Sequence, residues 1–153
     1  MGKKVIEGEK ELYEQLKIII SKEYEVKEVL GMIEKGSYNL KTGVICVKAE
    51  MEYLYKIKTL LHEYAHAIDF TIHPELEIRR NQREVVAESV AFLVSLRLGL
   101  DTSRESISYI KSWLNHEDEL YQIIDMVREI ALMVISYLEN SSEFTFYIDK
   151  ENY

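Results

Sequence analysis

Apolar residues recur at helical spacing along much of the chain, and the region around residues 31–48 breaks that pattern. Over residues 7–30 the large aliphatic side chains lie three or four positions apart, which predicts one helix or two short ones. Residues 36–43 are rich in turn-forming types, and residues 44–48 are rich in β-branched types. We therefore predict a strand over residues 44–48, entered through a hairpin turn at residues 39–43.

Helical patterns dominate the second half of the chain. The first covers residues 53–70, and the second covers residues 82–98 and ends before Gly99, a common residue after the end of a helix. A further helix, capped by one of residues 101–103, is expected to end near residue 114. A last helix is predicted over residues 116–138. Residues 144–148 are expected to form a short terminal strand or an ordered extension.

Together these elements predict an α+β, mostly helical fold, in which a short β-sheet or hairpin precedes the helix over residues 53–70. The chain has 153 residues, of which 47% are hydrophobic and 30% charged, as expected for one globular domain with a real core. Within that domain we expect an N-terminal helical segment, a hairpin with an edge strand, a helical core and a C-terminal tail, at residues 1–35, 36–50, 53–140 and 141–153.

The charge of the chain argues against one class of partner. A protein with a formal net charge of −8 repels the negative phosphate backbone, so direct nucleic-acid binding is not expected. The single cysteine, Cys46, cannot form an internal disulfide. No signal peptide is recognisable, and no segment approaches the ~20 apolar residues that span a bilayer. We therefore expect a cytoplasmic protein without a membrane anchor.

The residues with the clearest chemical potential are His62-Glu63-Tyr64-Ala65-His66, within the helix predicted over residues 53–70. Side chains four apart lie on one face of a helix, so His62 and His66 can share a metal ion. Neutral imidazole is a good zinc ligand, and Glu63 is placed to take a proton from an attacking water molecule. We therefore predict Zn²⁺ ligands at His62 and His66 and a catalytic base at Glu63. Two histidines satisfied without metal are the alternative.

A catalytic zinc site needs a third protein ligand and one open position. One known arrangement adds a glycine and a third histidine downstream of the motif. Here Asp69 and Ile72 stand at those two positions, and His73 comes one residue late. We therefore expect Asp69 to support the site or line its pocket without touching the metal, and His73 to lie exposed in a loop.

Another arrangement takes a glutamate from a later helix, and the helix over residues 82–98 offers Glu84 and Glu88 on one face. Glu88 lies deeper in the apolar run, where a carboxylate needs a cation nearby. We therefore predict Glu88 as the third zinc ligand and Glu84 as the residue that orients a histidine. The reversed assignment, with Glu84 as the ligand, remains open.

Three aromatic residues lie in or near these segments. Tyr109 and Trp113 are four residues apart on one predicted helix, and we expect a core aromatic pair. A tyrosine that reaches the cleft could instead stabilise the oxyanion of a tetrahedral intermediate, so Tyr109 is also a candidate catalytic residue. Tyr64 is expected to pack on the side of its helix away from the metal.

Several segments resemble the zincin-like metallopeptidases of the ImmA/IrrE and ArdC-type antirestriction group. They are TLLHEYAHA (59–67), AESVAF (87–92), LGLDTS (98–103) and YIKSWL (109–114), and the resemblance extends over roughly residues 37–138. It implies a helical zincin core with its third ligand at Glu88. It also implies that residues 44–48 form an edge strand beside the cleft, which binds an extended peptide by strand addition. Members of this group often carry a preceding domain that binds single-stranded DNA, for which ~35 residues are too few.

These observations lead to two functional hypotheses. The first is a zinc-dependent metallopeptidase that hydrolyses peptide bonds in a protein substrate, such as a regulator or host-defence protein of a phage or mobile element. The second is a non-catalytic acidic protein, in which the zinc site is structural or vestigial and which acts by binding a protein partner. A protein that binds no metal would exclude both.

Overall fold

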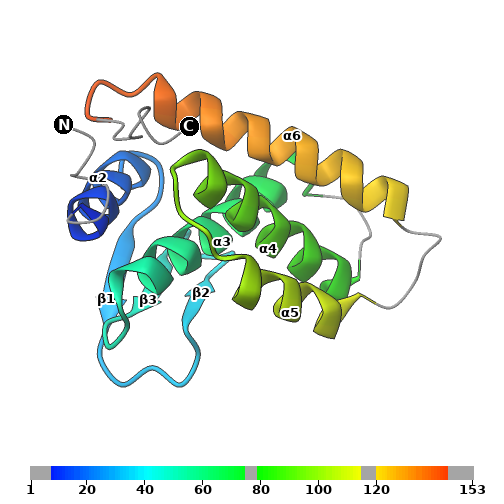
Figure 1. Ribbon diagram of the computed structural model, residues 1–153, viewed down its shortest axis with the longest axis horizontal. Coiled ribbons are helices and arrows are strands. Elements are labelled where there is room, and N and C mark those ends of the chain that lie inside the picture. Colours follow the sequence, from blue (N-terminus) through cyan, green and yellow to red (C-terminus); the bar gives the residue numbers. More distant parts are fainter. Residues whose placement is uncertain (1–7, 75–78, 115–119, 145–153) are drawn as a thin grey trace.

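The computed structural model describes residues 8–74, 79–114 and 120–144. In this part of the chain the fold is α+β and mostly helical, as predicted, with a three-stranded sheet beside a group of helices (Figure 1). The elements in chain order are α2 (Glu9–Ile20), β1 (Val26–Val29), β2 (Gly36–Tyr38), β3 (Ile45–Lys48), α3 (Tyr53–Ile72), α4 (Arg80–Arg97), α5 (Ser103–Trp113) and α6 (Leu120–Glu139).

Strand β1 corrects the prediction that residues up to 30 are helical. Helix α2 ends at Ile20, and β1 pairs in parallel with β3, with Val26 opposite Ile45. The apolar residues at 26, 29 and 30 are spaced as in a helix, but valine is β-branched and fits a half-buried strand. Pairing with a strand that comes later in the chain decides the conformation here, and local spacing does not reveal that pairing.

The predicted hairpin is confirmed by β2 and β3, which run antiparallel. Its turn is closed by a hydrogen bond from Asn39 N to Val44 O (3.0 Å) and another from Gly43 N to Asn39 O (2.8 Å). Gly43 has a φ of 73°, a left-handed conformation that glycine adopts without strain. The turn therefore has the residue type that its backbone requires.

The strand order β1-β3-β2 places β3 in the middle of the sheet. The prediction that residues 44–48 form the edge strand beside the cleft is therefore wrong, because β1 occupies the side of β3 that was expected to be free. Strand β2 is the edge strand that lies along α3. A Cβ at Gly36 would lie 2.5 Å from Thr59 Cγ2 and 3.2 Å from Glu63 Cγ. Glycine thus lets the edge strand lie directly on the helix that carries the motif.

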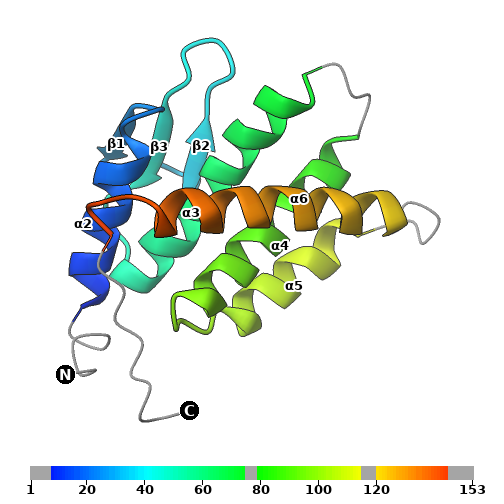
Figure 2. The ribbon, with the colours of Figure 1, turned by 90° about the horizontal axis from the view of Figure 1, so that it is seen from above.

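Helix α3 lies at the centre of the structure. It packs against α2, α4 and the sheet, while α6 crosses over α3 and α4 (Figures 1 and 2). Every residue of α3 from 56 to 69 is buried. The apolar core joins side chains from five elements, and its largest fully buried members include Tyr13, Leu16, Ile45, Ile57, Tyr64, Ile130 and Leu138. Packing on all sides of α3 therefore holds the motif residues in place.

The other helical predictions agree with the structure wherever it is described. Helix α4 is followed by Gly99 with a φ of 91°, and α5 begins after Thr102. The predicted start of the last helix at His116, and residues 145–148 of the predicted terminal strand, lie outside the described residues. None of the described helices is long and apolar enough to cross a membrane.

Candidate metal centre

Helix α3 brings the polar residues of the motif together, as the spacing predicts. The ring centroids of His62 and His66 lie 4.9 Å apart, and both side chains are buried. Glu63 is also buried, and all three residues line a cavity of about 750 Å³. The two histidines and the glutamate therefore share one chamber, which is large enough to admit part of a peptide.

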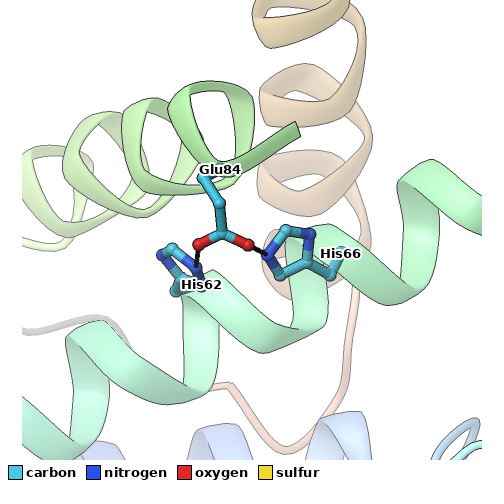
Figure 3. Close-up of side chains that lie close together, drawn as sticks. All are labelled: His62, His66 and Glu84. Atoms are coloured by element: carbon cyan, nitrogen blue, oxygen red, sulfur yellow. Dashed lines mark ion pairs between the residues drawn. The ribbon is translucent and has the colours of Figure 1, made fainter. Parts of the chain in front are cut away.

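Glu84 of α4 bridges the two histidines (Figure 3). Its Oε1 lies 3.3 Å from Nε2 of His62, and its Oε2 lies 2.9 Å from Nε2 of His66. The residue before it, Arg83, pairs with the buried Asp69 of α3 over 2.7 Å. This ion pair fixes α4 against α3 beside Glu84, so the carboxylate meets both rings.

These three residues have the donor atoms and spacing to hold a metal ion. One ring nitrogen of each histidine and a carboxylate oxygen of Glu84 all lie within 4.8 Å of one another. A tetrahedral zinc ion with bonds of about 2.0–2.1 Å keeps its ligand atoms about 3.3 Å apart, so small side-chain adjustments would suffice. Two imidazole nitrogens and one carboxylate also form a ligand set that occurs at catalytic zinc sites.

The third residue of this group is Glu84, whereas the sequence predicts Glu88 as the third zinc ligand. Oε1 of Glu88 lies 2.7 Å from Nδ1 of His62, the ring nitrogen that Glu84 does not contact. Oε2 of Glu88 lies 3.0 Å from Nζ of Lys58. Glu88 thus approaches His62 from the opposite side of the ring, and the geometry matches the reversed assignment that spacing alone left open.

The buried charges of the site shift one another's pKa. Burial by itself lowers the pKa of His62, but hydrogen bonds to Glu84 and Glu88 outweigh burial and raise that pKa to about 9. Burial by itself raises the pKa of Glu84, but hydrogen bonds from His62 and His66 hold it well below its usual range. Burial also raises the pKa of Glu63. The carboxylates of Glu84 and Glu88 therefore stabilise positive charge at the ring of His62.

Tyr109 of α5 reaches the same group. Its hydroxyl donates a hydrogen bond of 2.5 Å to Oε1 of Glu84, and its ring meets that of His62 edge-on, with centroids 5.5 Å apart. The predicted contact with Trp113 is present, with centroids 6.2 Å apart, but Tyr109 is only half-buried and does not belong to the core. Tyr109 lines the cavity together with Glu63. The structure therefore places this hydroxyl beside the candidate ligands, and its role towards an oxyanion stays a prediction.

The remaining predicted residues surround the group without joining it. Asp69 is buried and contacts Arg83 and His73, at 2.7 Å and 3.0 Å, so it supports the position of α4. His73 also lies 3.1 Å from Glu129 of α6, so this histidine is held by two carboxylates and is not free in a loop. Tyr64 packs among other tyrosines of the core, away from the site, as predicted.

The sequence pattern did not reveal two buried residues that contact Glu88. Lys58 lies one turn before His62 on α3, and Ser106 of α5 donates to Oε2 of Glu88 over 2.8 Å. The sequence does offer a signal for the Lys58 contact, because a lysine within a buried apolar helix needs a carboxylate partner. Nothing comparable marks Ser106, since a serine fits an exposed helix surface equally well.

No protein-family model matches this chain, and no curated protein or solved structure shows significant similarity to it. The resemblance to the ImmA/IrrE and ArdC-type group rests on the short segments quoted above.

Proposed function

We propose that the protein is a zinc-dependent metallopeptidase, with zinc held by His62, His66 and Glu84. The observation that supports this most directly is the convergence of their ligand atoms beside Glu63, at the wall of a cavity. A structural zinc site is closed by four protein ligands. In the described part of the chain this group has three, and they face open space, which favours a catalytic site.

Each residue of the site has a distinct role in this proposal. Zinc, when bound, supplies Lewis-acid chemistry towards a water molecule and the substrate carbonyl. Glu63 accepts a proton as the water oxygen bonds to the carbonyl carbon, and it then gives this proton to the leaving amine as the C–N bond breaks. The hydroxyl of Tyr109 stabilises the oxyanion formed between these two steps. Glu88 orients His62 through Nδ1.

The proposed peptide-binding edge is β2, in place of the predicted residues 44–48. Because Asn39 N donates to Val44 O, the main-chain groups of Asn39 face β3, and alternation along the strand turns those of Gly36 and Tyr38 outward. Both Gly36 and Tyr38 line the cavity. An extended peptide that pairs with them would carry a peptide bond past Glu63.

The class of substrate in this proposal is a protein. Main-chain pairing suits an extended segment of polypeptide, and the net charge of −8 disfavours nucleic acid as the ligand. The segment resemblance adds the analogy of a regulator or host-defence protein of a phage or mobile element. Binding of a protein partner without cleavage is the alternative that the test must separate.

Zinc content and cleavage of a peptide library test this proposal together. The protein is loaded with zinc, its metal content is measured, and a library of peptides from a digested proteome is analysed for new termini by mass spectrometry. We expect one zinc per chain, with cleavage that falls by about 10²–10⁴-fold in Glu63→Gln, which keeps its zinc. Zinc binding with no cleavage by either protein would favour the non-catalytic alternative. Absence of zinc would exclude both.

A further inference from the structure

Glu88 is fully buried, and both of its oxygens are engaged by different partners. Oε1 lies 2.7 Å from Nδ1 of His62. Oε2 accepts one hydrogen bond from Nζ of Lys58 (3.0 Å) and another from Oγ of Ser106 (2.8 Å). Two donors on one oxygen thus leave the other oxygen directed at the histidine ring.

Ser106 is itself held in place by a hydrogen bond with Thr102. Oγ of Ser106 lies 3.0 Å from Oγ1 of Thr102, and since Ser106 donates to Glu88, Thr102 must donate to Ser106. Both hydroxyl residues are fully buried, and Lys58 is 5% exposed. A continuous hydrogen-bonded path therefore runs from α5 through Glu88 of α4 to His62 of α3.

Core stability does not account for this arrangement. A buried ion pair loses so much hydration that apolar side chains of similar volume often stabilise a core equally well or better. An apolar residue at position 58 would thus be expected to stabilise the core as well as lysine does. A lysine and a serine that fix the rotation of one carboxylate do something that apolar residues cannot do, because they decide which oxygen meets His62.

We propose that Lys58 and Ser106 are positioning residues of the metal site, which act through Glu88 on His62. They hold Oε1 of Glu88 as the acceptor of the Nδ1 proton of His62, and this leaves Nε2, on the side of Glu84 and His66, as the nitrogen that would bind zinc in exchange for its own proton. The inference rests on the proposed zinc site. It adds that residues without any contact to the metal set its affinity.

Helix α3 supplies a matched control for Lys58. Lys56, two residues earlier, is also buried, and its Nζ lies 3.1 Å from a carboxylate oxygen of Glu28. Its ammonium group lies over the rings of Tyr13 and Tyr53, so it contacts no member of the metal centre. Lys56→Met and Lys58→Met therefore remove the same buried charge from the same helix, but only the second change reaches Glu88.

The test measures zinc affinity by competition with a chelator for the wild type, Lys58→Met, Ser106→Ala and Lys56→Met. We expect about tenfold weaker zinc binding in Lys58→Met and in Ser106→Ala, and a change within about twofold in Lys56→Met. Thermal unfolding of the zinc-free proteins shows whether each variant is folded. If Lys58→Met does not fold, Ser106→Ala still decides, because it removes one oxygen atom only.

A second measurement separates an effect on the orientation of His62 from a general effect on the stability of the fold. In the zinc-loaded wild type the Nδ1 proton of His62 should exchange slowly with water and give an NMR signal, and this signal should broaden or vanish in Lys58→Met but persist in Lys56→Met. Equal zinc affinity and equal exchange in these two variants would overturn the inference alone. A wild type that binds no zinc would overturn both the inference and the proposed function.

Discussion

Nδ1 of His62 lies 2.7 Å from Oε1 of Glu88, while Nε2 of the same ring lies 3.3 Å from Oε1 of Glu84. One imidazole thus meets two carboxylates from successive turns of α4, one at each ring nitrogen. Glu84 also contacts Nε2 of His66, at 2.9 Å, whereas the described contacts of Glu88 do not include His66. This relationship distinguishes a candidate ligand from a residue that orients a ligand.

The two glutamates are therefore expected to respond differently to the same substitution. Glu84→Gln removes a charged ligand and should weaken zinc binding by more than about a hundredfold, above the 10–100-fold range typical of residues that orient a ligand. Glu88→Gln keeps an oxygen that can accept from His62 and should stay within that range. Chelator competition measures both affinities, and an equal or larger loss in Glu88→Gln would contradict the assignment.

Gly36→Ala is expected to disturb both stability and the position of Glu63. The new Cβ would lie 2.5 Å from Thr59 Cγ2 and 3.0 Å from the main-chain oxygen of Cys46, so β2 must move away from α3. Overpacking of this kind destabilises by about 1–3 kcal/mol. Urea unfolding measures the loss, and Thr59→Ser in the same chain should restore part of it by removing Cγ2. A Gly36→Ala protein as stable as the wild type would contradict this close approach of β2 to α3.

Asp69→Ala is expected to loosen α4 from α3. It removes one partner of the buried ion pair with Arg83, a change that typically costs about 3–5 kcal/mol. Arg97→Ala is the control, because its pair with Glu139 lies on the surface and should contribute at most about 1 kcal/mol. Denaturant titration compares the two variants, and similar small losses would mean that the Asp69–Arg83 pair does not hold the helices together.

Tyr38→Pro tests whether substrate pairs with β2. The N–H of Tyr38 points away from β3, so proline should leave the hairpin intact while removing one donor from the outer edge. Tyr38→Ala loses the same ring but keeps the N–H. We expect KM for a cleaved peptide to be about fivefold to tenfold higher in Tyr38→Pro than in Tyr38→Ala, the effect of one hydrogen bond. Equal KM values would argue against strand addition at this position.

Acid is expected to weaken the contact between β1 and α3. Burial raises the pKa of Glu28, but hydrogen bonds from Lys56 and Tyr13 outweigh it, so the pKa lies below the ordinary value of 4.5. A depressed folded-state pKa adds stability that is fully present above 4.5 and is lost as the pH falls through the folded value. Between about pH 6 and pH 3 the wild type should therefore lose more stability than Lys56→Met. Parallel losses in urea unfolding would contradict this.

Local patterns account for most of the fold. Helices α3 and α4 follow from apolar residues at helical spacing, and the hairpin follows from the turn at residues 39–43 and the β-branched residues after it. Strand β1 does not follow, because its apolar residues fit either period and its partner β3 comes later in the chain. The same non-local pairing makes β3 a central strand, so the edge beside the cavity could not be assigned from local sequence.

The candidate site, too, is only partly predictable from local sequence. The i, i+4 spacing of His62 and His66 predicts their common direction, but Glu84 and Glu88 share a helix face as well, and only the crossing of α3 and α4 decides between them. A buried Glu88 needs a cation nearby, and the structure supplies the ammonium group of Lys58, at 3.0 Å.

Anomalous diffraction at the zinc absorption edge, from crystals of the zinc-loaded protein, tests the proposed metal site most directly. The site geometry predicts one zinc ion per chain, about 2.0–2.2 Å from Nε2 of His62, from Nε2 of His66 and from a carboxylate oxygen of Glu84. Glu88 should remain on Nδ1 of His62. No zinc at this point after zinc has been supplied, or zinc bound by Glu88 in place of Glu84, would contradict it.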